Sequence, residues 1–110
     1  MQEDTIARIE ARLKNSPNLA PENRAELLGL LAQLKGELET LSRTDADHAR
    51  SVAGFAELTA HEATREEPKP RLFHLSAAGL MSSVQGLELS HPKLTAVVNS
   101  LCQVLSNTGI

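Results

Sequence analysis

The sequence predicts an all-α protein, an antiparallel bundle or hairpin of about four helices with coiled-coil-like packing. Leucine and alanine supply most of its hydrophobic residues, whereas the chain has only two phenylalanines and neither tryptophan nor tyrosine. Leucines recur at alternating spacings of three and four residues, which places them on one side of a helix. Residues 72–110 carry only two charged side chains, so a long apolar helical face in this part must be covered. At 110 residues, the chain forms one domain.

The first two helices are predicted at residues 3–15 and 21–43. Pro17 ends the first helix, because proline and the residue before it both resist continuing a helix. Pro21 suits the first position of the second helix, where its missing N–H is not needed. Each helix has one apolar face, which consists of Ile6, Ile9 and Leu13 in the first and of Leu27, Leu31, Leu34 and Leu38 in the second.

A third and weaker helix is predicted at residues 45–65. Thr44, followed three residues later by Asp47, matches a capping box and indicates a new helix start. Gly54 and several alanines dilute the apolar face, and such small residues let another backbone approach closely. Residues 66–72 contain two prolines two positions apart, so this segment is predicted to be a linker. The apolar face of the third helix is predicted to comprise Val52, Phe55, Ala56 and Thr59.

The last helical segment is predicted at residues 73–107. A hydrophobic stripe continues through it in heptad steps, interrupted only by His91, which precedes Pro92. Because proline disfavours helix at the residue before it, the segment is either one kinked helix or two. The unbroken register favours two halves that stay roughly collinear, with His91 and Pro92 as hinge or cap residues. Gly109 is predicted to end the helix, because glycine is free to adopt the left-handed conformation.

The two strongest stripes are predicted to pack against each other as the core of the bundle. Together they exceed what one thin hairpin can cover, so we expect a homodimer that forms a larger bundle. The core residues that we predict are Leu27, Leu31, Leu34, Leu38, Leu80, Val84, Leu94, Val98, Leu101 and Leu105.

Residues 90–94 (Ser-His-Pro-Lys-Leu) and 105–110 (Leu-Ser-Asn-Thr-Gly-Ile) resemble a family of short bacterial proteins classed as a domain of unknown function. Residues 21–24 (Pro-Glu-Asn-Arg), which precede a run of leucines, are similar to the central helix of that family. The resemblance covers residues 5–43 and 80–110, and residues 44–72 look like extra length relative to shorter members. The resemblance implies a small all-helical fold, and it carries no activity, substrate or cofactor.

Charge and composition disfavour several functional classes. The chain has 11 basic and 14 acidic residues, and the basic ones are scattered, so nucleic-acid binding is not predicted. No apolar stretch reaches the ~18 residues that a membrane span requires, and residues 73–89 lack the basic side chains of a membrane-surface helix. The single Cys102 cannot form an internal disulfide, and the acidic N-terminus does not resemble a signal peptide. We therefore expect a bacterial-type cytoplasmic protein.

No catalytic, cofactor-binding or metal-binding motif stands out, so the chain is predicted to be no enzyme and to need no cofactor. Asp45, Asp47 and His48 form the best candidate cluster, because carboxylates and imidazole can bind Zn²⁺ or Mn²⁺. An acidic first turn also suits a helix N-terminus without any metal. His61 and the glutamate after it are predicted to lie on a solvated face.

The function predicted from the sequence is that of a non-enzymatic module that self-associates or binds a helical protein partner. The alternative is a protein that binds a small ligand or a divalent metal through Asp45, Asp47 and His48. His91 leaves a similar choice, because a histidine at a packing seam serves either as a cap or as a pH-sensitive switch.

Overall fold

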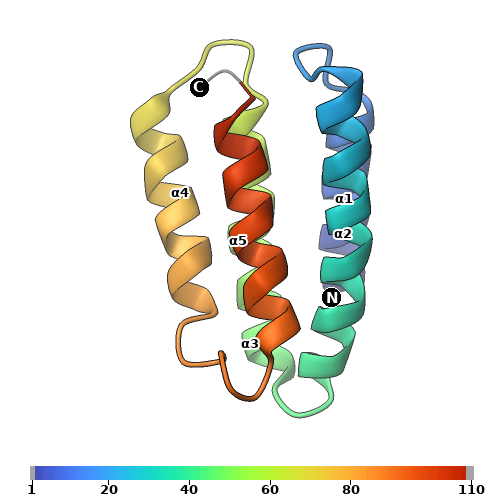
Figure 1. The fold of residues 1–110 in the computed structure, drawn as a ribbon, viewed down its shortest axis with the longest axis vertical. Helices are drawn as coiled ribbons and strands as arrows, with labels where there is room; N and C mark the ends of the chain where they lie inside the picture. Colours follow the sequence, from blue (N-terminus) through green and yellow to red (C-terminus); the bar gives the residue numbers. More distant parts are fainter. Residues whose placement is uncertain (1, 109–110) are drawn as a thin grey trace.

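Five helices form the fold, and the loop after each of the first four reverses the direction of the chain (Figure 1). The computed structural model of the protein describes residues 2–108, and within that range it contains helices and no strand, which confirms the all-α class. The helices are α1 (Gln2–Lys14), α2 (Pro21–Ser42), α3 (Ala46–Ala63), α4 (Pro70–Ser83) and α5 (Pro92–Ser106). None of these described helices is long and apolar enough to cross a membrane.

The segment predicted as helical at 73–107 is two helices, α4 and α5, which lie side by side and run in opposite directions (Figure 1). The expectation that its two halves stay collinear is therefore wrong, and the described chain has five helices rather than four. The chain leaves α4 after Ser83 and turns at Gly86, whose φ of 90° lies in the left-handed region that favours glycine. Helical periodicity identifies the residues that share an apolar face, but it does not report the direction of the next helix.

Prolines begin three of the helices, because the first helical position needs no backbone N–H. Pro70 is therefore the first residue of α4, and the predicted linker at 66–72 ends at Lys69. Pro92 likewise begins α5, with His91 at the N-cap position. The His91 side chain makes no capping hydrogen bond, although its backbone N–H donates to the carbonyl oxygen of Leu87 at 2.7 Å.

Thr44 and Gly109 are the two other residues that the sequence predicts to be helix caps. Thr44 is not the N-cap of α3; its hydroxyl instead donates to the carbonyl oxygen of Leu41 at the end of α2. The N-cap is Asp45, whose carboxylate accepts a hydrogen bond from the backbone N–H of His48 at 3.0 Å. Thr44 and Asp45 are both suitable cap residues, and the backbone conformation selects the second. The predicted cap Gly109 lies outside the described residues.

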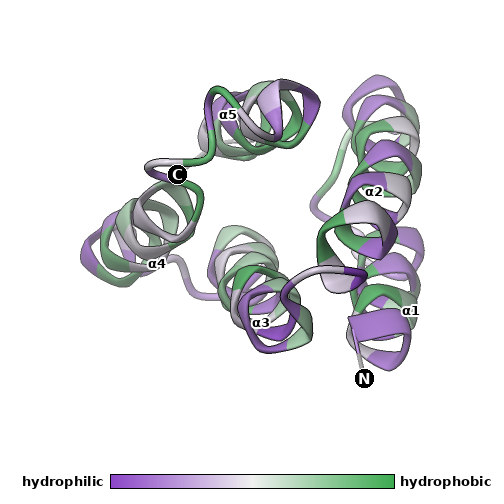
Figure 2. Cartoon of the chain, turned by 90° about the horizontal axis from the view of Figure 1, so that it is seen from below, coloured by the Kyte–Doolittle hydropathy of each residue, from purple (hydrophilic) through white to green (hydrophobic). Residues whose placement is uncertain are grey.

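Helix α3 contacts each of the other four helices. Figure 2 shows α3 between α1 and α4, with the hydrophobic sides of the helices turned toward the middle of the molecule. Small side chains on α3 make these contacts possible, because alanine lets neighbouring backbones approach closely. The buried alanines of α3 are Ala49, Ala53, Ala56, Ala60 and Ala63.

The core lies on the inner sides of all five helices. Its largest fully buried side chains include leucines from α1, α2, α4 and α5. All ten residues of the two sequence stripes are buried: Leu27, Leu31, Leu34, Leu38, Leu80, Val84, Leu94, Val98, Leu101 and Leu105. Helices α1 and α3 help to cover them, so these stripes do not need a second copy of the chain to remove them from water.

Candidate interaction surface

Asp45, Asp47 and His48 line one open pocket of about 430 Å³ between the start of α3 and the end of α4. The structure thus brings the three side chains together, but each already has a partner. Asp45 caps α3, Asp47 forms an ion pair with Arg50, and Nε2 of His48 lies 2.5 Å from the carbonyl oxygen of Ser83. Within residues 2–108, no three His, Cys, Asp or Glu side chains come close enough to hold a metal ion.

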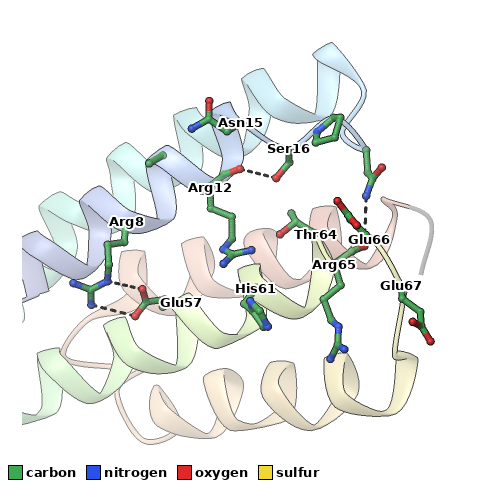
Figure 3. Close-up of a pocket in the computed structure, with 13 residues that line it drawn as sticks. Arg8, Arg12, Asn15, Ser16, Glu57, His61, Thr64, Arg65, Glu66 and Glu67 are labelled. Carbon is green, nitrogen blue, oxygen red and sulfur yellow. Dashed lines mark hydrogen bonds and ion pairs between the residues drawn. The ribbon is translucent and has the colours of Figure 1, made fainter.

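A larger pocket of about 800 Å³ lies between α1 and α3 (Figure 3). Nε of Arg8 donates to a carboxylate oxygen of Glu57 at 2.7 Å, and this hydrogen bond holds the pKa of Glu57 below its ordinary value. Figure 3 shows Arg12 extending from α1 toward His61 of α3. The charged lining residues of both signs are Arg8, Arg12, Arg65, Glu57, Glu66 and Glu67, so the pocket does not select a ligand by charge.

Glu62 is buried on α3, with only 8% of its side chain exposed. The prediction that it lies on a solvated face is therefore wrong. Its carboxylate accepts a hydrogen bond from Arg65 at 3.1 Å, which supplies the opposite charge that a buried carboxylate needs. His61 is half-buried, and its Nε2 lies 3.8 Å from the same carboxylate. This group of charges stabilises the end of α3 rather than forming an open site.

An apolar surface is exposed where α3 and α4 meet on the outside of the molecule. We call it the α3–α4 face, and it consists of Phe55 and Leu58 on α3 and Leu72 and Leu75 on α4. Between 40% and 62% of each of these side chains is exposed. Phe55 was predicted to lie in the apolar face of the third helix, whereas much of its ring is open to solvent.

Gly79 makes the α3–α4 face continuous. A Cβ atom at Gly79 would lie 2.6 Å from Cε1 of Phe55, so only glycine lets this ring rest directly on α4. Leu75 lies one helical turn before Gly79, and Leu58 lies one turn after Phe55. Because α3 and α4 run in opposite directions, both leucines lie on the same side of the Phe55–Gly79 contact (Figure 1).

The rim of the α3–α4 face differs in charge between its two ends. Helix α4 contains no carboxylate, and Arg71 near its start forms no ion pair with any of residues 2–108. At the opposite end, α3 begins with Asp45 and Asp47. Arg71 therefore has no ion-pair partner among residues 2–108, whereas at the other end Asp47 is paired with Arg50 and Asp45 caps the helix.

Cys102 on α5 is half-buried, and this burial raises the pKa of its thiol to about 11. The thiolate is the reactive form of cysteine, so this side chain behaves as a small apolar group at neutral pH.

A scan of protein-family models, a search of curated proteins and a search of solved structures each found no match for this chain. The resemblance to a family of short bacterial helical proteins stays a prediction. The heptad pattern does not reveal the α3–α4 face, because its leucines do not occupy heptad positions. Leu58, Leu72 and Leu75 are among the large apolar residues that fall outside both stripes, and this was the available signal.

Proposed function

We propose that this chain is a non-enzymatic helical module that binds another protein chain through the α3–α4 face. The observation that carries the proposal is the exposure of five large apolar side chains on two adjoining helices, namely the four of the α3–α4 face and Met81 of α4. Apolar residues scattered singly over a surface are ordinary, but a contiguous group marks an interaction site. Leu89 is even more exposed, at 98%, but it lies alone in the loop between α4 and α5.

The shape of the face favours a helical partner. Two antiparallel helices leave a shallow seam between them, and an amphipathic helix can lay an apolar stripe along such a seam. The two polar pockets support the proposal by contrast, because many of their charged groups are paired within the chain, as in Arg8–Glu57 and Asp47–Arg50. We therefore place the function in recognition of a protein surface rather than in chemistry on a bound substrate.

The test compares a face variant with a matched surface variant. In the face variant, Leu58→Ser and Leu75→Ser are combined; in the control, Leu89→Ser removes an exposed leucine far from the face. Both variants should keep wild-type helicity, because Leu75 and Leu89 are mostly exposed; the half-buried Leu58 should lower the thermal midpoint of the face variant only slightly. We expect affinity capture from extracts of the source cells to recover the same proteins with wild type and control, and to lose them with the face variant. Equal recovery by the face variant would refute the proposal.

A further inference from the structure

We propose that the pocket between α1 and α3, called the α1–α3 pocket, binds a small zwitterion, a molecule that carries one carboxylate and one ammonium group. Amino acids and short peptides with free ends have this chemistry. The pocket has a volume of about 800 Å³, within the usual range of small-molecule sites, and its lining does not include the α3–α4 face. The site is therefore independent of the proposed function, and its evidence is which lining charges lack a partner in the chain.

Two contacts between separate parts of the chain bound the α1–α3 pocket. The Arg8–Glu57 ion pair joins α1 to α3 at one end, with Nε of Arg8 2.7 Å from a carboxylate oxygen. At the other end, the side-chain amide of Asn18 donates to the carbonyl oxygen of Arg65 at 3.4 Å (Figure 3). This hydrogen bond joins the loop after α1 to the loop after α3. The walls of the pocket are thus connected on both sides of the residues between these contacts.

Arg12 occupies the position at which the Arg8–Glu57 pair would repeat. Helices α1 and α3 run in the same direction, because the loops after α1 and α2 each reverse the chain (Figure 1). Arg12 lies one turn after Arg8, and Figure 3 shows it extending toward His61. His61 lies one turn after Glu57, so position 61 offers Arg12 an imidazole where a carboxylate would neutralise it. The pKa of Glu57 is lowered by the hydrogen bond from Arg8 and also by the charge of Arg12, so this charge acts within the pocket.

Arg12 has no carboxylate partner, since none of the ion pairs among residues 2–108 includes it. Glu62, which follows His61, is buried and already accepts a hydrogen bond from Arg65 at 3.1 Å. A guanidinium can bind a carboxylate through two parallel hydrogen bonds, and an imidazole beside it can donate another. Arg12 and His61 therefore provide the place for the carboxylate of the ligand.

Glu66 is the unpaired anion of the α1–α3 pocket. It lies in the loop after α3, and it belongs to no ion pair within residues 2–108, Arg12 included. Its neighbour Glu67 is paired with Lys69 at 3.0 Å. The lining charges are balanced, so the pocket does not select a ligand by net charge. The two unpaired charges that remain have opposite signs and do not reach each other, and a zwitterion that spans them satisfies both.

The probes are glycine, glycylglycine and triglycine, which place the two charges at increasing separation. Binding is followed through the backbone amide chemical shifts of isotope-labelled protein at constant ionic strength and neutral pH. Because the pocket is open to solvent, we expect dissociation constants in the millimolar range, with the largest shifts at residues of the pocket. The N-acetylated form of the tightest probe, which lacks the ammonium group, should bind about fivefold more weakly or worse.

Two variants remove one charge contact each. Arg12→Gln and Glu66→Gln should each raise the dissociation constant of the tightest probe about fivefold or more. Their matched controls are Lys14→Gln and Glu67→Gln, which remove charges that already have a partner within the chain. The controls should leave the dissociation constant within about twofold. All four side chains belong to exposed residues, so far-ultraviolet circular dichroism should show wild-type helicity throughout.

His61→Glu tests the repeat between α1 and α3. The new carboxylate can pair with Arg12 as Glu57 pairs with Arg8, so the dissociation constant should rise about tenfold or more. A wild-type protein that shows no saturable shift with any probe would overturn the inference, as would undiminished binding by His61→Glu. Equal effects of the test and control variants, or equal binding of the acetylated probe, would overturn it as well. Leu58→Ser with Leu75→Ser should leave the dissociation constant unchanged, so this site and the proposed function succeed or fail separately.

Discussion

Replacing Arg24 with alanine should cost more stability than replacing any solvent-exposed arginine of the chain. Arg24 lies in the first turns of α2, and its guanidinium donates three hydrogen bonds to backbone carbonyl oxygens. These acceptors are Leu13 at 3.1 Å, Ser16 at 2.7 Å and Leu19 at 3.2 Å. One side chain thus satisfies the end of α1 and the loop that leads into α2. All three acceptor residues are buried, so their carbonyl groups have few other partners.

The magnitude follows from the number and kind of these bonds. A hydrogen bond to a charged group contributes about 1.5–3 kcal/mol, but three bonds from one guanidinium are not additive. Water can also reach part of this site, because Arg24 itself is only half-buried. We therefore expect Arg24→Ala to lower the free energy of unfolding by about 2–3 kcal/mol. For a domain of this size, the thermal midpoint should fall by roughly 8–12 °C.

The assay is equilibrium urea unfolding followed by far-ultraviolet circular dichroism. Arg8→Ala is the matched control, because Arg8 is largely exposed and its hydrogen-bond partners, Thr5 and Glu57, lie at the protein surface. Arg24→Lys should recover only part of the loss, because an ammonium group lacks the planar geometry that reaches three acceptors. If Arg24→Ala shifts the unfolding midpoint no more than Arg8→Ala, the guanidinium does not hold this junction and the reasoning is wrong.

Three further predictions concern the core, an ion pair and the thiol. Leu34→Asp or Leu101→Asp places a carboxylate among buried side chains, so each should abolish the cooperative unfolding transition; native helicity in either would contradict the assigned core. The hydrogen bond from Arg8 lowers the pKa of Glu57 from 4.5, so the stability that this carboxylate contributes is present above pH 4.5 and lost as the pH falls through the lower folded-state pKa. Urea unfolding of Glu57→Gln at a series of pH values should no longer show this loss of stability at acid pH. If the variant loses as much stability as the wild type, the Arg8–Glu57 pair is not the source of the loss. Because burial raises the pKa of Cys102 from 9.0 to about 11, alkylation of the native thiol near pH 8 should be about a hundredfold slower than in the unfolded chain, and equal rates would refute its burial.

The helical class follows from sequence because leucine periodicity depends only on local geometry. A face repeated every three and four residues has one solution, an α-helix with that face covered. Helix starts are similarly local where proline occupies the first position, as at Pro21 and Pro92. Choosing between Thr44 and Asp45 as the cap is harder, because both side chains can accept the same kind of hydrogen bond and only the backbone conformation separates them.

Other features depend on where the chain goes after a helix ends. The heptad register continues across Pro92, yet α4 and α5 run in opposite directions because the chain turns at Gly86. Arg24 offers another example, since its acceptors lie 5 to 11 residues earlier, at the end of α1 and in the loop after it, and the sequence does not specify the shape of this loop. The α3–α4 face arises in the same way. Leu58 and Leu75 are unremarkable on separate helices, and become a surface only when those helices lie side by side.

Adjacent residues of α3 show how one helix can serve two separate purposes. Ala53 is fully buried, and its small side chain keeps α3 close to its neighbours, so a larger residue there would force the helices apart. Gly54 is exposed with open space around it, so a larger residue there leaves the fold intact. Small residues on the inner side of α3 are thus required by contacts within the chain. Gly54, on the outer side, is not required by such contacts. A larger residue at this position would therefore act on a molecule that contacts the α3–α4 face, and not on the fold.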